Sequence, residues 1–142
     1  MIVYLDTSAF VKLFSSEPGR VETRRVIAAA EQLASSQITY AETRAALARK
    51  HRMRELDAAA FERGKLDLER DWTTLYRLPP HAQIVRRAGD LAELLALRAY
   101  DAIHLATAEQ LRLDTGASVA FACFDRALNR AAATLGLLPA MT

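Results

Sequence analysis

The sequence has little cysteine and no long hydrophobic run. Cys123 is the only cysteine among 142 residues, so no disulfide can form within the chain, and a buried structural thiol is expected. No stretch approaches the roughly 18 apolar residues that a membrane-spanning helix requires. No basic start precedes Asp6 and the apolar run before it is too short for a signal peptide. These absences predict a cytoplasmic protein with no membrane segment.

The sequence also has little net charge and little lysine. A formal net charge of +2 does not by itself indicate a nucleic-acid-binding protein. The lysines are Lys12, Lys50 and Lys65, and the other positive side chains are arginines, which bind phosphate better in a bidentate manner. An Arg- and Ala-rich genome would give the same bias. The length and an apolar share of 51% are ordinary for one soluble domain, spanning residues 1–142.

Short apolar runs alternate with helical patterns along the whole chain. Asp57 has the character of a helix N-cap, and Gly136 follows the last helical pattern. The alternation predicts an α/β fold, with a short parallel sheet of about four to five strands sandwiched by helices. The expected strands are 2–5, 33–36, 74–78 and 118–124. The expected helices are 7–14, 21–32, 39–52, 57–72, 84–97, 101–113 and 126–135.

Four acidic residues follow apolar strand-like runs or lie in the first turns of helices. Such positions gather at the carboxyl ends of parallel strands, where α/β proteins bind their ligands. An unpaired buried carboxylate costs several kcal/mol, and several carboxylates together repel one another. A divalent cation is the simplest compensation, so the pattern predicts a metal-dependent enzyme. The four residues are Asp6, Glu42, Asp101 and Asp125.

Four segments in order resemble one protein family. They are Val3–Leu13, Thr39–Arg44, Arg98–Ala108 and Phe124–Leu128, and the segment containing Asp101 and His104 is the most specific. Together they resemble the PIN domain ribonucleases and, within them, the VapC-type toxins of bacterial toxin–antitoxin pairs. The resemblance covers essentially the whole chain and implies a PIN-like fold.

The resemblance also implies a chemistry. Asp6, Glu42, Asp101 and Asp125 correspond to the acidic quartet that binds Mg²⁺ or Mn²⁺ in this family and cleaves RNA. Asp6 and Asp101 are expected to bind the metal directly, and Glu42 and Asp125 through water or a second ion. Thr7 and Ser8 match supporting hydroxyls beside the first acid. Hydrolysis by metal-activated water needs no catalytic histidine and should leave 5′-phosphate and 3′-hydroxyl ends.

The partners implied by the resemblance are an RNA and an antitoxin. Related toxins cut particular tRNAs or a ribosomal RNA loop, and a VapB-like antitoxin silences them by filling the acidic site. The resemblance implies that the chain forms a homodimer, that the antitoxin places a basic side chain among the four acids, and that expression of the chain alone arrests growth.

Each of these residues also has a simpler structural interpretation. An acid near a helix start is usually a cap or a dipole partner, and Thr7 and Ser8 can cap the first helix. His104 lies three residues after Asp101 and is expected to make a core hydrogen bond rather than to bind metal. The basic stretch 44–54 is either a track for RNA phosphates or a solvated face.

Three other function classes compete with the ribonuclease interpretation. A receiver-like signalling domain also has acids at strand ends, but it needs a lysine after a late strand, and no lysine follows Lys65. A binding module without nuclease activity could use the acids to hold a partner's arginine. A DNA-cleaving repair relative would need additional elements that a chain of this length does not accommodate.

Overall fold

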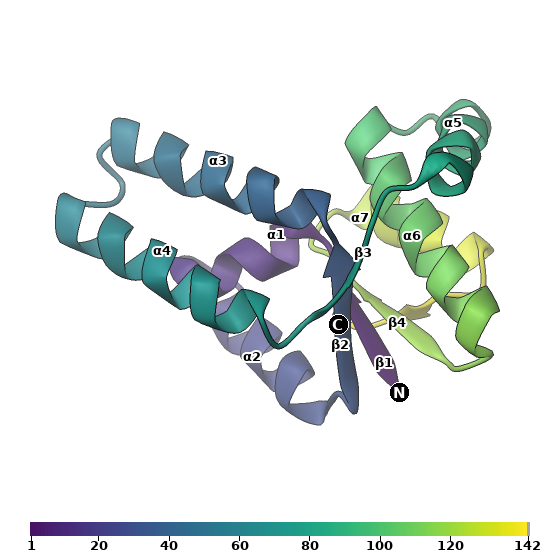
Figure 1. The fold of residues 1–142 in the computed structure, drawn as a ribbon, viewed down its shortest axis with the longest axis horizontal. Helices are drawn as coiled ribbons and strands as arrows, with labels where there is room; N and C mark the ends of the chain where they lie inside the picture. Colours follow the sequence, from purple (N-terminus) through teal and green to yellow (C-terminus); the bar gives the residue numbers. More distant parts are fainter. Residues whose placement is uncertain (142) are drawn as a thin grey trace.

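Five parallel strands form the centre of the fold. The computed structural model describes residues 1–141, and the strand order is β3-β2-β1-β4-β5 (Figure 1). Tyr4 in the central strand lies between Ala34 of β2 and Phe121 of β4. The predicted α/β fold with a parallel sheet is therefore confirmed. The strands are β1 (Ile2–Leu5), β2 (Gln32–Ser36), β3 (Tyr76–Leu78), β4 (Val119–Ala122) and β5 (Leu138–Pro139).

Helices connect the strands in the expected order, with two corrections. The helix expected at 7–14 is an α-helical turn followed by a 3₁₀ segment. The helix expected at 21–32 ends at Ala29, because Ala30 is extended and the Glu31 amide already donates to the Met1 carbonyl at the sheet edge. The helical elements are α1 (Thr7–Phe10), η1 (Val11–Phe14), α2 (Arg20–Ala29), α3 (Ile38–Arg52), α4 (Ala58–Trp72), α5 (Ala82–Leu95), α6 (Ala99–Thr115) and α7 (Arg126–Thr134).

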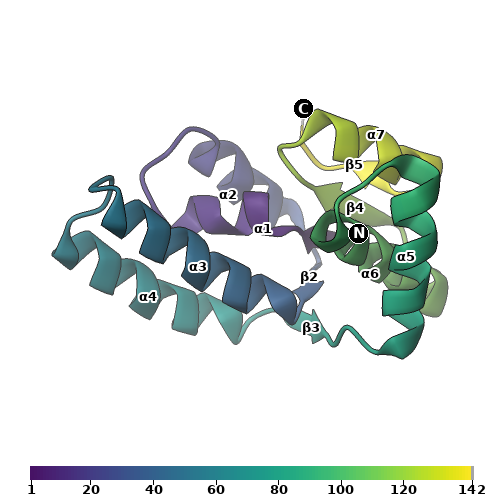
Figure 2. The same cartoon turned by 90° about the horizontal axis from the view of Figure 1, so that it is seen from above.

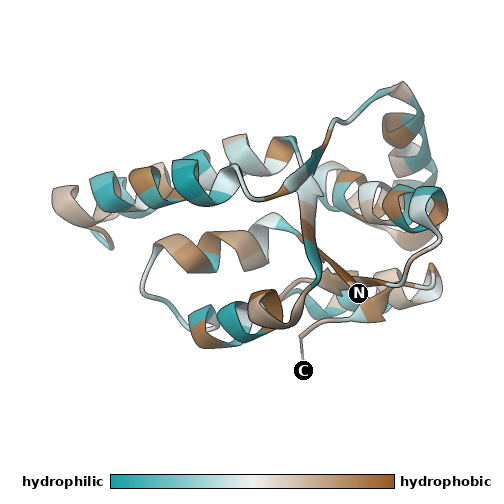
Figure 3. Cartoon of the chain, turned by 60° about the horizontal axis from the view of Figure 1, so that its bottom comes forward, coloured by the Kyte–Doolittle hydropathy of each residue, from teal (hydrophilic) through white to brown (hydrophobic). Residues whose placement is uncertain are grey.

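Strand alternation divides the core into two layers. Side chains of a strand point alternately to the two faces of the sheet. Tyr4 and Phe121 face the layer formed by α5, α6 and α7, whereas Val3 and Leu5 face the layer formed by α1, η1, α3 and α4. Both layers are hydrophobic, and the first strand, which begins at the N-terminus, is brown in Figure 3. A sheet buried on both faces fits the continuous apolar runs in β1 and β4.

The α3–α4 hairpin extends beyond the sheet, on the opposite side from α5 (Figures 1 and 2). Its base packs on η1, where Gly64 leaves no room for a side chain, because an added Cβ would lie 3.0 Å from the Phe14 carbonyl oxygen. The beginning of α3 lies beside α1, which directly follows the central strand. Within residues 1–141, no helix has the length and hydrophobicity to cross a membrane.

Candidate active site

Asp6 follows the central strand β1 and caps helix α1. Its Oδ1 accepts hydrogen bonds from the Ser8 hydroxyl at 2.7 Å and from the Ala9 amide at 3.0 Å. Only 4% of the residue is exposed. Burial raises the pKa of the Asp6 carboxyl, against the opposing effects of His104 and of the hydrogen bonds from Ser8 and Cys123. Asp6 therefore caps helix α1 and also occupies a candidate catalytic position.

Glu42 lies in the second turn of α3 and joins the segment after β1. Its Oε1 accepts a hydrogen bond from the Thr7 hydroxyl at 2.7 Å and lies 2.7 Å from Nε2 of His104. Burial opposes ionisation of Glu42, but hydrogen bonds from His104 and Thr7 and the charge of His104 lower the pKa of the carboxyl. Glu42 is therefore held in its ionised form beside Thr7, the residue that follows Asp6.

His104 connects this carboxylate to the core. The side chain is buried on α6, and its Nδ1 lies 2.8 Å from the Tyr4 hydroxyl in the central strand. The prediction of a core hydrogen bond for His104 is confirmed. Tyr4 was not recognised as a site residue from the sequence. The available signal was a tyrosine inside an otherwise aliphatic strand that ends at Asp6.

Ser8 connects Asp6 to the loop that carries Asp125. The Ser8 hydroxyl donates to Asp6 and accepts a hydrogen bond from the Phe124 amide at 3.1 Å. Asp125 caps α7 by accepting from the Leu128 amide at 2.9 Å, and the residue is exposed. Thr7 and Ser8 do not cap α1, because Asp6 does. They instead link the first acid to two distant segments of the chain.

Asp101 lies in the first turn of α6 and pairs with an arginine. Its Oδ2 is 3.2 Å from Nε of Arg98, whose side chain is 86% exposed, whereas that of Asp101 is 27% exposed. Ion pairs with an exposed partner are weak. The guanidinium of Arg98 is therefore a cation that can leave Asp101 at little cost in free energy.

The four acids do not form a closed cluster. Within residues 1–141, no three histidine, cysteine, aspartate or glutamate side chains converge into a ready-made metal-binding group. Each acid directs an oxygen to a donor near it: Asp6 to Ser8, Glu42 to Thr7, Asp101 to Arg98 and Asp125 to Leu128.

The residues nevertheless fit a hard divalent cation. Asp6 is a buried carboxylate, and the ionised form of such a group needs a compensating positive charge. The hydrogen bonds described use only Oε1 of Glu42, Oδ2 of Asp101 and Oδ1 of Asp125, so each keeps a second oxygen for another partner. Carboxylate oxygens are the ligands that Mg²⁺ and Mn²⁺ prefer.

Cys123 and the basic stretch 44–54 lie around this core. Cys123 is buried, as expected, and burial followed by the charge of Asp6 raises the pKa of its thiol, so it is not a reactive thiolate. In the basic stretch, Lys50 pairs with Glu17 and Glu55. Arg49 is exposed on α3 and has no ion pair within the described residues.

Comparison with known proteins agrees with this arrangement. The PIN domain family model matches residues 3–134. Ribonuclease VapC45 of Mycobacterium tuberculosis is 36% identical over 135 residues, which cover 95% of this chain and 92% of the relative.

Solved structures give the same fold. FitAcB from Neisseria gonorrhoeae superposes with a TM-score of 0.66 and 22% identity, over 99% of this chain and 98% of that one. A toxin–antitoxin complex from Klebsiella pneumoniae gives a TM-score of 0.62 and 24% identity, over 87% and 86% of the two chains. Divalent-metal dependence is general among PIN domain ribonucleases. The chain thus belongs to the PIN domain family, in the branch of the VapC ribonucleases.

Proposed function

We propose that this chain is the endoribonuclease toxin of a toxin–antitoxin pair, and that it hydrolyses RNA with Mg²⁺ or Mn²⁺ at Asp6, Glu42, Asp101 and Asp125. The observation that carries the proposal is the buried Asp6 carboxylate at the end of the central strand, followed by Thr7, whose hydroxyl donates to Glu42. Membership in the VapC branch supports the reaction class. The protein acts in the cytoplasm, where its RNA substrates are.

The metal and the side chains have different roles in the proposed reaction. When bound, the cation neutralises charge on the phosphate and makes water more acidic. Asp6 and Asp101 would hold the cation directly, and Glu42 and Asp125 would act on it through water. Thr7 and Ser8 keep Glu42 and the loop of Asp125 in place relative to Asp6. The exposed Arg98 can then turn from Asp101 towards the RNA.

A cleavage assay tests the nuclease proposal. Purified protein should cut a labelled RNA in Mg²⁺ or Mn²⁺, stop in EDTA, and resume when excess metal is restored. Asp6→Asn preserves the shape and the cap of α1 but removes one charge, so it should lose cleavage while remaining folded. Equal cleavage by wild type and Asp6→Asn, or cleavage that is unchanged by EDTA, would contradict the proposal.

The toxin role has its own test. We propose a homodimer and an antitoxin that inserts a basic side chain among the four acids, where it replaces the charge of the metal. Expression of wild-type protein alone should arrest bacterial growth, and Asp6→Asn should not. Co-expression of the small reading frame next to the gene should restore growth and yield a complex on size-exclusion chromatography. Normal growth with abundant soluble wild-type protein would rule out the toxin role.

A further inference from the structure

A buried chain of hydrogen bonds runs from the middle of the sheet to Glu42. Tyr4 is fully buried and stacks on Phe121, with ring centroids 5.6 Å apart and ring planes 5° apart. Its hydroxyl lies 2.8 Å from Nδ1 of His104, and Nε2 of His104 lies 2.7 Å from Oε1 of Glu42. Tyr4 and His104 are 100 positions apart in the sequence, so only the fold brings them together.

The direction of these hydrogen bonds follows from the chemistry of the groups. A carboxylate only accepts, so the contact between His104 and Glu42 requires a proton on Nε2. The Nδ1 atom of a neutral ring must then accept from the Tyr4 hydroxyl. A protonated ring would instead donate to the Tyr4 oxygen from the same position. In both cases Tyr4 fixes the ring, and the ring presents Nε2–H to Glu42.

Glu42 needs such a support more than the other acids do. Its side chain is longer than that of aspartate, and 29% of it is exposed. Holding a glutamate in one rotamer costs side-chain entropy, more than holding the shorter aspartate. Thr7 and His104 both donate to Oε1, so they fix the position of this oxygen and leave Oε2 for another partner. A rigid core residue therefore sets the orientation of a carboxylate at the surface.

We propose that His104, oriented by Tyr4, is the positioning residue that holds Glu42 for metal binding and catalysis. Both ring nitrogens are occupied by protein partners, so His104 acts through Glu42 and does not bind the metal itself. This inference rests on the proposed metal-dependent nuclease function. If the role of His104 were purely structural, only the size of the ring would affect metal affinity. For a positioning residue, metal affinity should depend on the hydrogen-bond donor at the position of Nε2.

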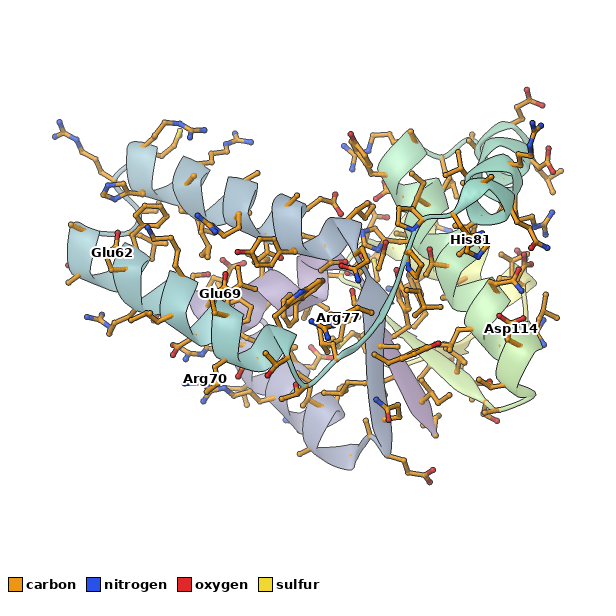
Figure 4. All side chains as sticks on the ribbon, in the orientation of Figure 1. Glu62, Glu69, Arg70, Arg77, His81 and Asp114 are labelled. Atoms are coloured by element: carbon orange, nitrogen blue, oxygen red, sulfur yellow. The ribbon has the colours of Figure 1, made fainter. Side chains whose placement is uncertain are left out.

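Two variants of His104 separate these possibilities. In His104→Gln, the amide nitrogen can occupy the position of Nε2 and still donate to Glu42. In His104→Asn, the shorter amide reaches only the position of Nδ1, so it can bond Tyr4 but not Glu42. Tyr4→Phe preserves the ring stack on Phe121 and removes only the hydroxyl that orients His104. His81→Asn, at the start of α5 and exposed, is the control for loss of an imidazole (Figure 4).

The first measurement is Mn²⁺ binding without RNA, followed by electron paramagnetic resonance of the free ion. His104→Asn should weaken Mn²⁺ binding by about 10-fold, the lower end of the effect of losing an outer-shell partner of a metal site, because Glu42 acts on the metal through water. His104→Gln should recover most of the affinity, Tyr4→Phe should give an intermediate loss, and His81→Asn should match wild type. Equal affinities in wild type and His104→Asn would overturn the proposal.

The second measurement is the kinetics of cleavage of an oligoribonucleotide at saturating metal, with the melting temperature recorded for each variant. His104→Asn should lower kcat and leave KM for RNA within about twofold, because Glu42 acts on the metal and not on RNA binding. Equal losses for His104→Asn and His104→Gln that follow the fall in melting temperature would overturn the positioning role. If wild type does not cleave RNA at all, the nuclease proposal fails, while the Mn²⁺ comparison still decides the role of His104.

Discussion

Lys50 of α3 and Glu17 of the loop before α2 form an ion pair, with Nζ 2.8 Å from Oε2. The other carboxylate oxygen, Oε1, accepts from Lys12 of η1 at 2.5 Å. Burial works against ionisation, but hydrogen bonds from the two lysines and Ser15 lower the pKa of Glu17 from 4.5 to about 2. One carboxylate thus ties together η1, the loop before α2 and the last turn of α3.

This ion pair predicts a dependence of stability on pH. The folded state lowers the pKa of Glu17, so its stabilisation is complete above about pH 4.5 and is lost as pH falls towards about 2. Glu17→Gln should lower the free energy of unfolding by about 1–2 kcal/mol at pH 7, and by much less at pH 3. Glu55→Gln is the control, because the exposed Glu55 lies 3.5 Å from Lys50. Urea unfolding at both pH values measures the free energy of unfolding. An equal loss of this free energy in Glu17→Gln at pH 7 and pH 3 would contradict the stabilising role of ionised Glu17.

Ionisation of Asp6 should destabilise the metal-free fold, whereas ionisation of Glu17 stabilises the fold. Burial raises the pKa of Asp6, so its ionisation above about pH 3.8 costs the metal-free fold free energy. Asn still caps a helix, so Asp6→Asn should be as stable as wild type or more stable in EDTA at pH 7. Mg²⁺ at about 100 times its dissociation constant should stabilise wild type by about 2.7 kcal/mol and the variant by much less.

Asp125 also caps a helix, and without metal its substitutions report on the cap alone. Asp125→Ala should lose about 1 kcal/mol through the missing bond to the Leu128 amide, and Asp125→Asn should lose little. Melting curves with and without Mg²⁺ test both acids. A sharp loss of stability in Asp6→Asn, with no effect of Mg²⁺ on wild type, would make Asp6 a structural cap only.

The Thr7 hydroxyl should be needed for turnover. Thr7→Val has nearly the same shape but cannot donate to Glu42, whereas Thr7→Ser can. Thr7→Val should lower kcat by about 10-fold, and Thr7→Ser should stay within about threefold of wild type. Steady-state kinetics on a short RNA measures both variants. If Thr7→Val retains full kcat, the bond between Thr7 and Glu42 does not serve catalysis.

Arg98 should compete with the metal for Asp101. Removal of an exposed cation from a ligand changes its affinity by at most about 1 kcal/mol, so Arg98→Gln should tighten Mn²⁺ binding by about two- to fivefold. Arg70→Gln on α4 is the matched control, since Arg70 pairs with two acids of its own helix (Figure 4). Weaker Mn²⁺ binding in Arg98→Gln than in Arg70→Gln would show that Arg98 supports the site instead.

The ends of the RNA products report on the nucleophile. A water nucleophile leaves a 5′-phosphate and a 3′-hydroxyl, whereas attack by the RNA 2′-hydroxyl leaves a 2′,3′-cyclic phosphate. His104 has both ring nitrogens engaged, His51 contacts the Leu56 carbonyl oxygen after α3, and His81 lies at the exposed start of α5. In the described residues, no pair of histidines is therefore arranged for the second route. Ligation assays and mass spectrometry of the products should find only 5′-phosphate, and cyclic phosphate would exclude the hydrolytic mechanism.

The sequence predicted the features that depend on local pattern. The runs that end at Asp6 and Asp125 are β1 and β4, because continuous apolar residues mark strands buried on both faces. The two-residue strand β5 was missed, because Leu138–Pro139 is too short for any periodicity and pairs with β4 only through tertiary packing. The bond between Tyr4 and His104 was missed for the same reason, since no local pattern encodes a contact across 100 positions.

The strand order has a consequence for the time at which the protein becomes active. β1 is the first strand made and the middle strand of the sheet, and its neighbour β4 begins at Val119. The proposed site uses residues from Asp6 to Asp125, so a nascent chain cannot complete it until Asp125 has left the ribosome. Contacts between such distant positions also form late in folding. On the proposed function, a product of translation that stops before Asp125 lacks one acid of the site and should not cleave RNA.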